Sequence, residues 1–392
     1  MKYVKLRWKD KTLEGLLISE DEHYQLKLKS GYNVLIPVKE AEILEEREVE
    51  KRVPKVEMED SGGDTTVILT GGTILSKVDY ETGAVYPSED LSEIIPYPAK
   101  IVRFPLKFSE DFSPEDWEKI SKTIYQELEK NQKIIVFHGT DTMHYSASAV
   151  AFAIRAFPRP AVFVGAQRSS DRPSSDQFLN IRHAFKASTL PIGESVIVMH
   201  ETISDTSTHV LRGVRARKMH TSRRDAFQPI GTGKLARIMG EKIEYIDPHL
   251  PPRELEKPLT SFSKEAGILY SYPGLSLEML DIFLEKHKGV VIMGTGLGHL
   301  GHPNEQEKLR ILKEHIEKGK IVVMTSQTIY GRINMNVYSA GRKLKEVGVL
   351  GHELDMVPET AYVKLSWILG NNLPPETYHK NLVQEVNKRS IA

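Results

Sequence analysis

Three segments of the sequence carry side chains whose types and spacing could together transfer an acyl group. Thr73 follows a pair of glycines in TVILTGGTI, and Thr140 and Asp141 stand together in HGTDTM. The third segment is the basic stretch RGVRARKMHTSRRDAF, residues 212–227. A threonine hydroxyl is a weak nucleophile until a base or another neighbouring group activates it. Two hydroxyls and a carboxylate form an acyl-transfer set if a basic side chain also reaches them.

The glycine pair before Thr73 allows three interpretations. An apolar strand that runs into Gly71 and Gly72 can end in an ordinary structural turn, where glycine permits an unusual backbone and a close approach. A phosphate-binding loop is disfavoured, because the segment lacks P-loop spacing and the Lys-Ser/Thr pair. The third interpretation makes Thr73 a nucleophile whose activating partner comes from elsewhere in the chain.

The second segment also has a simpler structural explanation. Thr140 and Asp141 lie between the apolar run IIVF and a helix rich in small residues. Asp141 in that place could serve only as a helix cap. However, capping alone does not explain two strands that both end in Gly-Thr, each with its hydroxyl at the carboxyl edge of the sheet. The site hypothesis therefore stands beside the capping hypothesis.

The basic segment has three possible roles. It could be a solvated charged face, a nucleic-acid patch, or the source of one buried lysine. A lysine that is desolvated beside Asp141 could have a lowered pKa and activate a hydroxyl. The spacing alone does not choose among the four candidates, which are Arg212, Arg215, Arg217 and Lys218.

A further motif, residues 296–301, reads G-x-G-x-x-G after an apolar strand. A dinucleotide site would also need an acidic residue about 20 residues later, at the end of the next strand. That strand ends in Met324-Thr325-Ser326, so a Rossmann site is disfavoured. His299 and His302 could suggest a metal site. This short segment has no Asp or Glu that could complete a set of metal ligands, so we interpret both histidines as structural or surface residues.

The elements that must position these residues alternate between strands and helices. Seven short β-branched runs are expected to be parallel strands buried on both faces: residues 66–72, 133–139, 160–166, 195–201, 267–274, 289–296 and 320–326. Helical patterns cover residues 112–130, 141–157, 176–188, 276–287, 304–319 and 358–370. In the first of these, Ser113 is the expected N-cap and Pro114 the first helical residue. This order predicts an open α/β sheet with ligands at the carboxyl ends of its strands.

The first part of the chain follows a different pattern. Short alternating strands around a tight turn at Ser30–Asn33 predict a meander that closes into a small β-barrel. The charged stretch 40–64, which ends in Ser-Gly-Gly-Asp, is interpreted as a linker. The predicted division is a barrel at 1–55, a charged linker at 56–64, an N-terminal catalytic α/β domain at 65–250, a linker at 251–266 and a C-terminal α/β domain at 267–392.

Composition narrows the functional classes. The 392 residues include no cysteine, which excludes disulfides, thiolate metal sites and a cysteine nucleophile. The 53 basic and 53 acidic residues balance, so the chain lacks the overall basic charge typical of nucleic-acid binding. No apolar run approaches the roughly 18 residues of a membrane span, and the N-terminus has no signal-peptide core. We therefore expect a cytoplasmic protein without membrane contacts.

The motifs TGGTI, HGTDTM, VGAQR and RARKMHTSRRDAF together resemble the bacterial-type L-asparaginases in content, order and approximate spacing. The resemblance extends over about residues 66–370. It implies that Thr73 is the acylated nucleophile, that Tyr80 is its close neighbour, and that Lys218 is the motif lysine. It places the threonine–aspartate pair of the family at Thr140 and Asp141. The family leaves open which of the two threonines is acylated first.

The same resemblance implies a set of substrate contacts. The substrate-binding serine of the family, upstream of a helix tryptophan, matches Ser109, and Ala166 sits where a backbone carbonyl faces the side-chain amide. The implied substrate-binding set is Ser109, Glu110, Ala166, Gly72 and Gly139. Glu110 stands where many asparaginases carry glutamine or serine. His299 stands near the position of a substrate-side asparagine that comes from a neighbouring subunit in many of them.

A small β-domain before an asparaginase-like body is similar to the D-subunit family of archaeal glutamyl-tRNA(Gln) amidotransferases. This resemblance implies hydrolysis of L-glutamine to glutamate and ammonia, which supplies the E-subunit of the amidotransferase. The E-subunit, with ATP and Mg²⁺, converts Glu-tRNA(Gln) to Gln-tRNA(Gln), and no cofactor is expected in this chain. The implied assembly is a homodimer of this chain within a heterotetramer, with tRNA bound mainly through the partner.

Two alternatives stand beside this expectation. One is a free L-asparaginase that hydrolyses L-asparagine without a partner. The other is a non-catalytic scaffold whose barrel and arginine cluster hold tRNA while another subunit does the chemistry. The neutral overall charge and the presence of four separate site motifs disfavour the scaffold.

Overall fold

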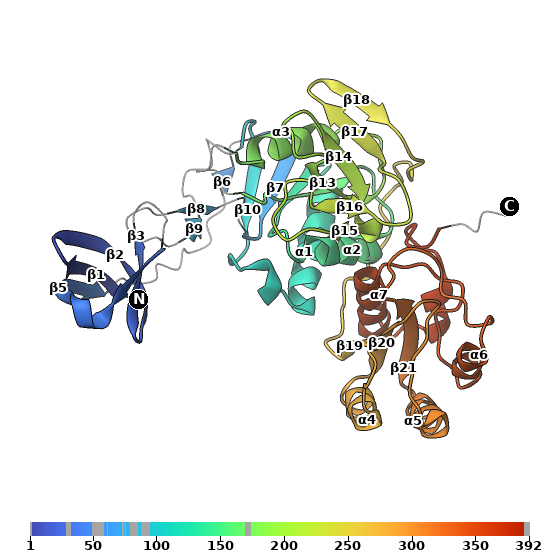
Figure 1. The fold of residues 1–392 in the computed structure, drawn as a ribbon. Helices are drawn as coiled ribbons and strands as arrows, with labels where there is room; N and C mark the ends of the chain where they lie inside the picture. Colours follow the sequence, from blue (N-terminus) through green and yellow to red (C-terminus); the bar gives the residue numbers. More distant parts are fainter. Residues whose placement is uncertain are drawn as a thin grey trace.

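A computed structural model of the chain provides the structure (Figure 1). It describes residues 2–28, 33–48, 59–60, 62–72, 74, 76–78, 85–87, 95–168 and 174–387. Thr73, Tyr80 and the predicted tight turn at residues 30–32 lie outside the described residues.

The N-terminal strands form a five-stranded antiparallel sheet. Its order is β4 (Asn33–Pro37), β3 (His23–Leu28), β2 (Lys11–Glu20), β1 (Lys2–Trp8) and β5 (Ala41–Glu48). Buried Val4, Leu6, Leu26 and Ile36 pack on one another in this sheet. The meander is therefore confirmed, whereas closure into a barrel stays a prediction.

The interpretation of residues 40–64 as a linker was wrong in two places. Ala41–Glu48 is strand β5, which pairs antiparallel with β1. Its acidic side chains face basic ones on that neighbour, with Lys2 Nζ 2.7 Å from Glu46 Oε1. Glu59–Asp60 forms the short strand β6, which pairs with the edge of the central sheet.

The central sheet has nine strands. Their order is β18 (Lys242–Tyr245), β17 (Ala236–Met239), β14 (Thr208–Arg212), β13 (Ser195–His200), β12 (Ala161–Val164), β11 (Lys133–Phe137), β7 (Thr65–Leu69), β10 (Lys100–Arg103) and β6. The five strands from β13 to β10 are parallel. The apolar sequences of β7, β11, β12 and β13 predicted this, whereas β10 was not among the predicted strands. The outer strands β14, β17, β18 and β6 run antiparallel to their neighbours.

Helices cover both faces of this sheet, so its inner strands β7, β12 and β13 are buried along their whole length (Figure 1). Successive side chains of a strand point to opposite faces. Ile68 therefore joins the core under α1 (Pro114–Glu129) and α2 (Met143–Ile154), while Val67 and Leu69 join the core under α3 (Gln177–Ala187). Helix α1 begins as predicted, because Asp116 accepts hydrogen bonds from both the backbone and the hydroxyl of Ser113.

The C-terminal part contains a second, parallel sheet. Its strands are β19 (Ala266–Tyr270), β20 (Gly289–Gly294) and β21 (Ile321–Ser326). The helices are α4 (Leu277–Lys286), α5 (Glu305–Glu317), α6 (Ser339–Glu346) and α7 (Pro358–Gly370). Helix α7 packs against α2, so one continuous core joins the two α/β parts. Trp117 of α1 meets Tyr362 of α7 edge-on, with ring centroids 6.1 Å apart.

The remaining elements are short. Two antiparallel ribbons pair β8 (Ser76–Val78) with β9 (Val85–Pro87) and β15 (Ala216–Lys218) with β16 (Phe227–Pro229). Single 3₁₀ turns are η1 (Val38–Glu40), η3 (Ser109–Asp111), η4 (Gly213–Arg215) and η5 (Pro375–His379). Among the described residues, no helix is both long and apolar enough to cross a membrane.

Three buried histidines predict a loss of stability in acid. Burial lowers the pKa of His138 and His209 to about 4 and that of His144 to about 3, from 6.5. Because the unfolded chain then takes up protons before the folded one, this stability is present above pH 6.5 and is lost as the pH falls towards 4. We expect each histidine to cost about 1.4 kcal/mol per pH unit in that window.

Urea unfolding between pH 7 and pH 5 measures this effect. His209→Gln should reduce the pH slope of the unfolding free energy, whereas the same change at exposed His23 should leave it unchanged. An unfolding free energy that does not vary with pH in this range would contradict the prediction.

Candidate active site

Loops that follow three neighbouring parallel strands meet at the carboxyl edge of the central sheet. Gly72, beyond β7, has φ +91°, and a Cβ there would lie only 2.4 Å from Gly139 Cα in the loop beyond β11. The two backbones therefore touch, which only glycine at position 72 allows. A Cβ at Gly165, beyond β12, would similarly lie 2.8 Å from Thr140 Cγ2. Thr140 is thus at the meeting point of all three loops.

The structure separates Asp141 from the cap of the following helix. Helix α2 begins at Met143, its N-cap is Thr142, and no side-chain cap hydrogen bond is present. The Thr142 hydroxyl instead donates to the Ser109 carbonyl oxygen at 2.6 Å. Thr140 is 8% exposed, whereas the Asp141 side chain is 63% exposed. The capping explanation of Asp141 is therefore wrong, and its carboxylate is accessible to a ligand.

Lys218 is the basic group that reaches this pair. It ends β15, and its side chain is 10% exposed. Its Nζ donates to Thr140 Oγ1 at 2.9 Å and to Asp141 Oδ1 at 2.7 Å. The short ribbon holds the lysine in place, because Lys218 pairs with Phe227 of β16. A hydroxyl, an ammonium group and a carboxylate thus form one hydrogen-bonded chain.

The three arginines that competed with Lys218 bind elsewhere. Arg212 forms two hydrogen bonds with Glu194, at 2.6 and 2.9 Å. Arg215 is 1% exposed and donates to the backbone oxygens of Asp355 and Glu385 in the C-terminal part.

Arg217 pairs with Glu359 at the start of α7, with Nε and Oε1 2.9 Å apart. Burial raises the pKa of Glu359, and Arg217 partly opposes that rise. Side chains of a strand alternate between its faces. Strand β15 therefore turns Arg217 towards the C-terminal part and Lys218 towards Thr140.

Two further predicted residues lie beside these loops. Ser109 is 3% exposed in η3, and its carbonyl is tied to Thr142. Glu110, the next residue, is exposed. Ala166 is 1% exposed and follows Gly165, which lies against Thr140. Ser109 and Ala166 are thus brought next to the Thr140 loop.

A buried histidine holds the backbone of the loop beyond β11 in place. His138 is fully buried, and burial lowers its pKa to about 4, so the ring is neutral near pH 7. Its Nδ1 lies 2.7 Å from the Gly139 carbonyl oxygen, and its Nε2 lies 2.8 Å from Ser146 Oγ. The carbonyl can only accept, so Nδ1 carries the hydrogen and Nε2 accepts from the serine hydroxyl. The side chain therefore fixes the Gly139 peptide.

The G-x-G-x-x-G segment forms a tight turn. The backbone N–H groups of Gly298 and His299 both donate to the Thr295 carbonyl, at 3.0 and 2.9 Å. Helix α5 begins only at Glu305, so these glycines do not lead directly into a helix N-terminus. This geometry, like the sequence, disfavours a dinucleotide site.

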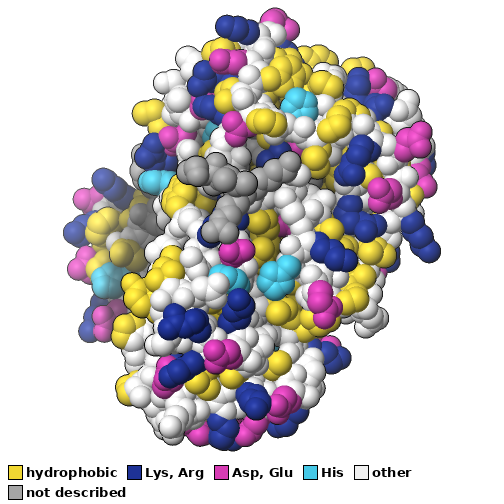
Figure 2. All heavy atoms as spheres, turned by 90° about the vertical axis from the view of Figure 1, so that its right-hand side faces the viewer, with side chains coloured by type: hydrophobic (Ala, Val, Ile, Leu, Met, Phe, Trp, Pro, Cys, Tyr) yellow, Lys and Arg dark blue, Asp and Glu magenta, His cyan; other side chains and the backbone are white. Residues whose placement is uncertain are grey.

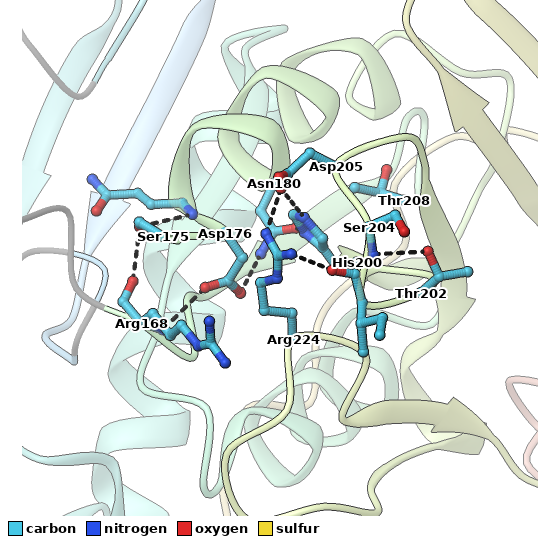
Figure 3. A network of polar contacts seen from close by, with 12 residues as sticks. Arg168, Ser175, Asp176, Asn180, His200, Thr202, Ser204, Asp205, Thr208 and Arg224 are labelled. Carbon is cyan, nitrogen blue, oxygen red and sulfur yellow. Dashed lines mark hydrogen bonds and ion pairs between the residues drawn. The ribbon is translucent and has the colours of Figure 1, made fainter. Parts of the chain in front are cut away.

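Sequence reasoning missed a buried polar network behind the β12 loop (Figure 3). Asp176 and Asn180 are both fully buried and contact each other, with Nδ2 of Asn180 3.0 Å from Asp176 Oδ2. Asn180 also binds His200, and His200 lies 3.1 Å from Asp205. The available signal was an i, i+4 pair of polar residues, Asp176 and Asn180, at the start of an otherwise amphipathic helix.

Comparisons with known proteins agree with this geometry. The sequence matches the family "Asparaginase, N-terminal" over residues 65–250 and the "Glutaminase/Asparaginase C-terminal domain" over residues 266–382.

Two named relatives are D-subunits of glutamyl-tRNA(Gln) amidotransferases. The one from Pyrococcus abyssi is 40% identical and covers 97% of this chain and 89% of the relative. The one from Pyrobaculum aerophilum is 43% identical and covers 91% of this chain and 89% of the relative.

Among solved structures, the thermostable L-asparaginase from Thermococcus kodakarensis is similar with a TM-score of 0.74 and 27% identity. The match covers 83% of this chain and 99% of that one. The chain therefore belongs to the asparaginase/glutaminase family of amidohydrolases and, within it, to the D-subunit family of glutamyl-tRNA(Gln) amidotransferases.

Proposed function

We propose that this chain hydrolyses the side-chain amide of L-glutamine and supplies the ammonia to a partner subunit for the amidation of Glu-tRNA(Gln). The observation that supports this most strongly is the contact of Lys218 Nζ with both Thr140 Oγ1 and Asp141 Oδ1. A proton-transfer chain at the carboxyl edge of a parallel sheet suits the activation of a hydroxyl nucleophile. The names of the relatives support the tRNA-linked role.

In the proposed reaction, the Thr73 hydroxyl attacks the carbon of the glutamine carboxamide. Its proton moves through Thr140, Lys218 and Asp141, and Tyr80 assists Thr73. Delivery of a proton to the amide nitrogen breaks the C–N bond and releases ammonia, which leaves a γ-glutamyl ester on Thr73. Water then attacks the ester carbonyl, which releases glutamate and restores the threonine hydroxyl.

Chain connectivity supports this role for Thr73. Thr73 directly follows Gly72 in the sequence. Gly72 itself touches Gly139, the neighbour of Thr140. Backbone N–H groups of Thr73 and Thr140 are the proposed oxyanion donors, and one such donor contributes about 3 kcal/mol to catalysis.

The free ends of glutamine would orient its amide over the nucleophile. The exposed carboxylate of Asp141 suits the substrate ammonium group. Ser109 and backbone N–H groups near Gly72 and Gly139 suit its carboxylate, and Glu110 lies beside them. In this proposal the Ala166 carbonyl accepts a hydrogen bond from the side-chain amide.

The proposed assembly is a homodimer of this chain bound to the E-subunit of the amidotransferase in a heterotetramer in the cytoplasm. The E-subunit would hold ATP and Mg²⁺ and most of the tRNA contacts. Basic and acidic side chains are interspersed over the face drawn in Figure 2, as far as that face is described. Direct binding of tRNA would favour a concentrated basic patch. The mixed surface therefore fits better with tRNA contacts made mainly through the partner.

A free L-asparaginase is the second candidate, because the similar solved structures include L-asparaginases from Thermococcus kodakarensis and Vibrio cholerae. Its reaction would use the same hydrogen-bonded chain on a substrate that is one methylene shorter. The non-catalytic scaffold has no comparable support, because Lys218, Thr140 and Asp141 would then meet without a role.

Ammonia release separates these candidates. We expect release from glutamine that is strengthened by the E-subunit and Glu-tRNA(Gln), together with much weaker release from asparagine. Coupled detection of ammonia, with each substrate and with or without the partner and tRNA, measures this. Strong asparagine turnover that needs no partner would favour the free asparaginase. No release from either substrate under any condition would favour the scaffold.

A further inference from the structure

Asp176 occupies the place of a helix cap but serves another purpose. It is the N-cap residue of α3, yet its side chain makes no cap hydrogen bond. Its carboxylate instead turns back to the loop beyond β12. Gln167 N lies 3.0 Å from both carboxylate oxygens, and Arg168 N lies 3.0 Å from Oδ1. A fully buried carboxylate needs such partners, because burial without them is costly.

The hydrogen bond from Gln167 N fixes more than its own residue. The N–H of Gln167 and the carbonyl of Ala166 belong to the same peptide group. That group is planar, and no cis peptide is present among the described residues, so its C=O and N–H point in opposite directions. Because the N–H points at Asp176, the Ala166 carbonyl must point away from it.

The peptide on the other side of Ala166 is held as well. Asn180 Nδ2 donates to the Gly165 carbonyl at 3.0 Å and to Asp176 Oδ2 at 3.0 Å. Ala166 is therefore flanked by two peptide groups whose orientations are set by one pair of buried side chains. Gly165 lies against Thr140, so the fixed segment borders the proposed site.

The side chain of Asn180 is in turn held in place by His200, as Figure 3 shows. Its Nδ2 faces two acceptors, so its Oδ1 is the atom that faces His200, and Nδ1 of His200 donates to it at 2.6 Å. His200 also lies 3.1 Å from Asp205, and Arg224 Nη1 lies 2.6 Å from the same Asp205 oxygen. The pair Asp176–Asn180 is thus fastened to the segment that follows Lys218 in the chain.

We propose that Asp176 is a positioning residue: its carboxylate, held by Asn180, directs the Ala166 carbonyl towards the N–H of the substrate amide. This assignment rests on the proposed function. It predicts selectivity for amides, because an ester in the same position has no N–H to donate. Asp176 acts through the peptide and need not touch the substrate.

Asp176→Asn tests the assignment with little change in size. An NH₂ group would replace one of the two oxygens that face the Gln167 N–H; it cannot accept, and it would oppose a second donor, either Arg168 N or Asn180 Nδ2. We expect kcat/KM for glutamine to fall about tenfold, mainly through a higher KM, as a single hydrogen bond is lost. Hydrolysis of the γ-methyl ester of L-glutamate should change by less than about twofold.

Two further variants keep the test decisive. Asn180→Ala removes the support of Asp176 and of the Gly165 carbonyl, and it should reproduce the selective loss if Asp176→Asn does not fold. Ser175→Ala is the matched control, because its hydroxyl binds the Arg168 carbonyl at 2.9 Å in the same loop but does not touch the peptide between Ala166 and Gln167. It should leave the ratio of amide to ester hydrolysis unchanged.

Equal losses on amide and ester, or no loss on the amide, in either folded variant would overturn the assignment. A wild-type protein that releases no ammonia from glutamine would instead contradict the proposed function. The assignment of Asp176 would then be tested in the same way on asparagine and the corresponding aspartate ester.

Discussion

Replacement of Lys218 by methionine is expected to reduce glutamine hydrolysis by at least about 10²-fold, because positioned proton transfer contributes about 10²–10⁴-fold to such reactions. Methionine keeps most of the length and volume of the lysine but removes the group that contacts Thr140 Oγ1 and Asp141 Oδ1. The loss should fall on kcat more than on KM, because the lysine takes part in the proton transfer from the Thr73 hydroxyl through Thr140. Steady-state ammonia release at saturating glutamine measures it.

The same substitution at exposed Lys242, on the edge strand β18, is the matched control and should leave the rate unchanged. Thermal unfolding of both variants shows whether the fold is retained. A folded Lys218→Met protein with a wild-type rate would remove the lysine from the mechanism. The prediction does not depend on whether glutamine or asparagine is the better substrate.

Alanine at Thr73 or at Thr140 is expected to abolish hydrolysis. Without its hydroxyl, Thr73 cannot form the ester, and water would have to attack the amide directly. Loss of Thr140 Oγ1 removes the acceptor 2.9 Å from Lys218 Nζ and so interrupts the proton path. Thr140→Ser keeps that hydroxyl and should retain a measurable part of the rate.

Single-turnover assays with excess enzyme set the limit of detection for these variants. Wild-type-like ammonia release by either folded alanine variant would exclude that threonine from the mechanism. Restoration of activity in Thr140→Ser, but not in Thr140→Ala, would assign the effect to the hydroxyl and not to packing.

The arrangement of strands and helices could be predicted from the sequence because the pattern was strong and local. The apolar runs ending at Leu69, Phe137 and Val164 required cover on both faces, and the helices on either side of the parallel sheet supply it. Helices α1 and α7 begin at Pro114 and Pro358, as the sequence indicated. Strand β5 was missed, because its acidic residues resemble a linker until the basic side chains of β1 lie beside them.

The choice of Lys218 shows what local sequence lacks. Four basic residues within seven positions are indistinguishable by type and spacing. Which of them reaches Thr140 depends on the direction in which β15 points its side chains. It also depends on acidic partners that are distant in sequence, such as Glu359 for Arg217 and Glu194 for Arg212. Only the resemblance to asparaginases named the lysine before the structure placed it.

Asp176 is a second residue whose hydrogen-bond partners could not be predicted from the sequence. The structure makes it the N-cap residue of α3, where an aspartate side chain commonly accepts hydrogen bonds from the first backbone N–H groups of its own helix. Its actual partners are the N–H groups of Gln167 and Arg168, in a loop that precedes it in the chain. These contacts join residues eight and nine positions apart, and hydrophobic periodicity carries no information about them.

The central claim is that glutamine is hydrolysed through an ester on Thr73, and acid quenching during turnover tests it most directly. Peptide mapping by mass spectrometry of wild-type protein, quenched with saturating glutamine present, should show one γ-glutamyl group on the peptide that contains Thr73. The group should be absent from Thr73→Ala. An ester found only on the peptide that contains Thr140, or ammonia release with no ester on either peptide, would contradict the account.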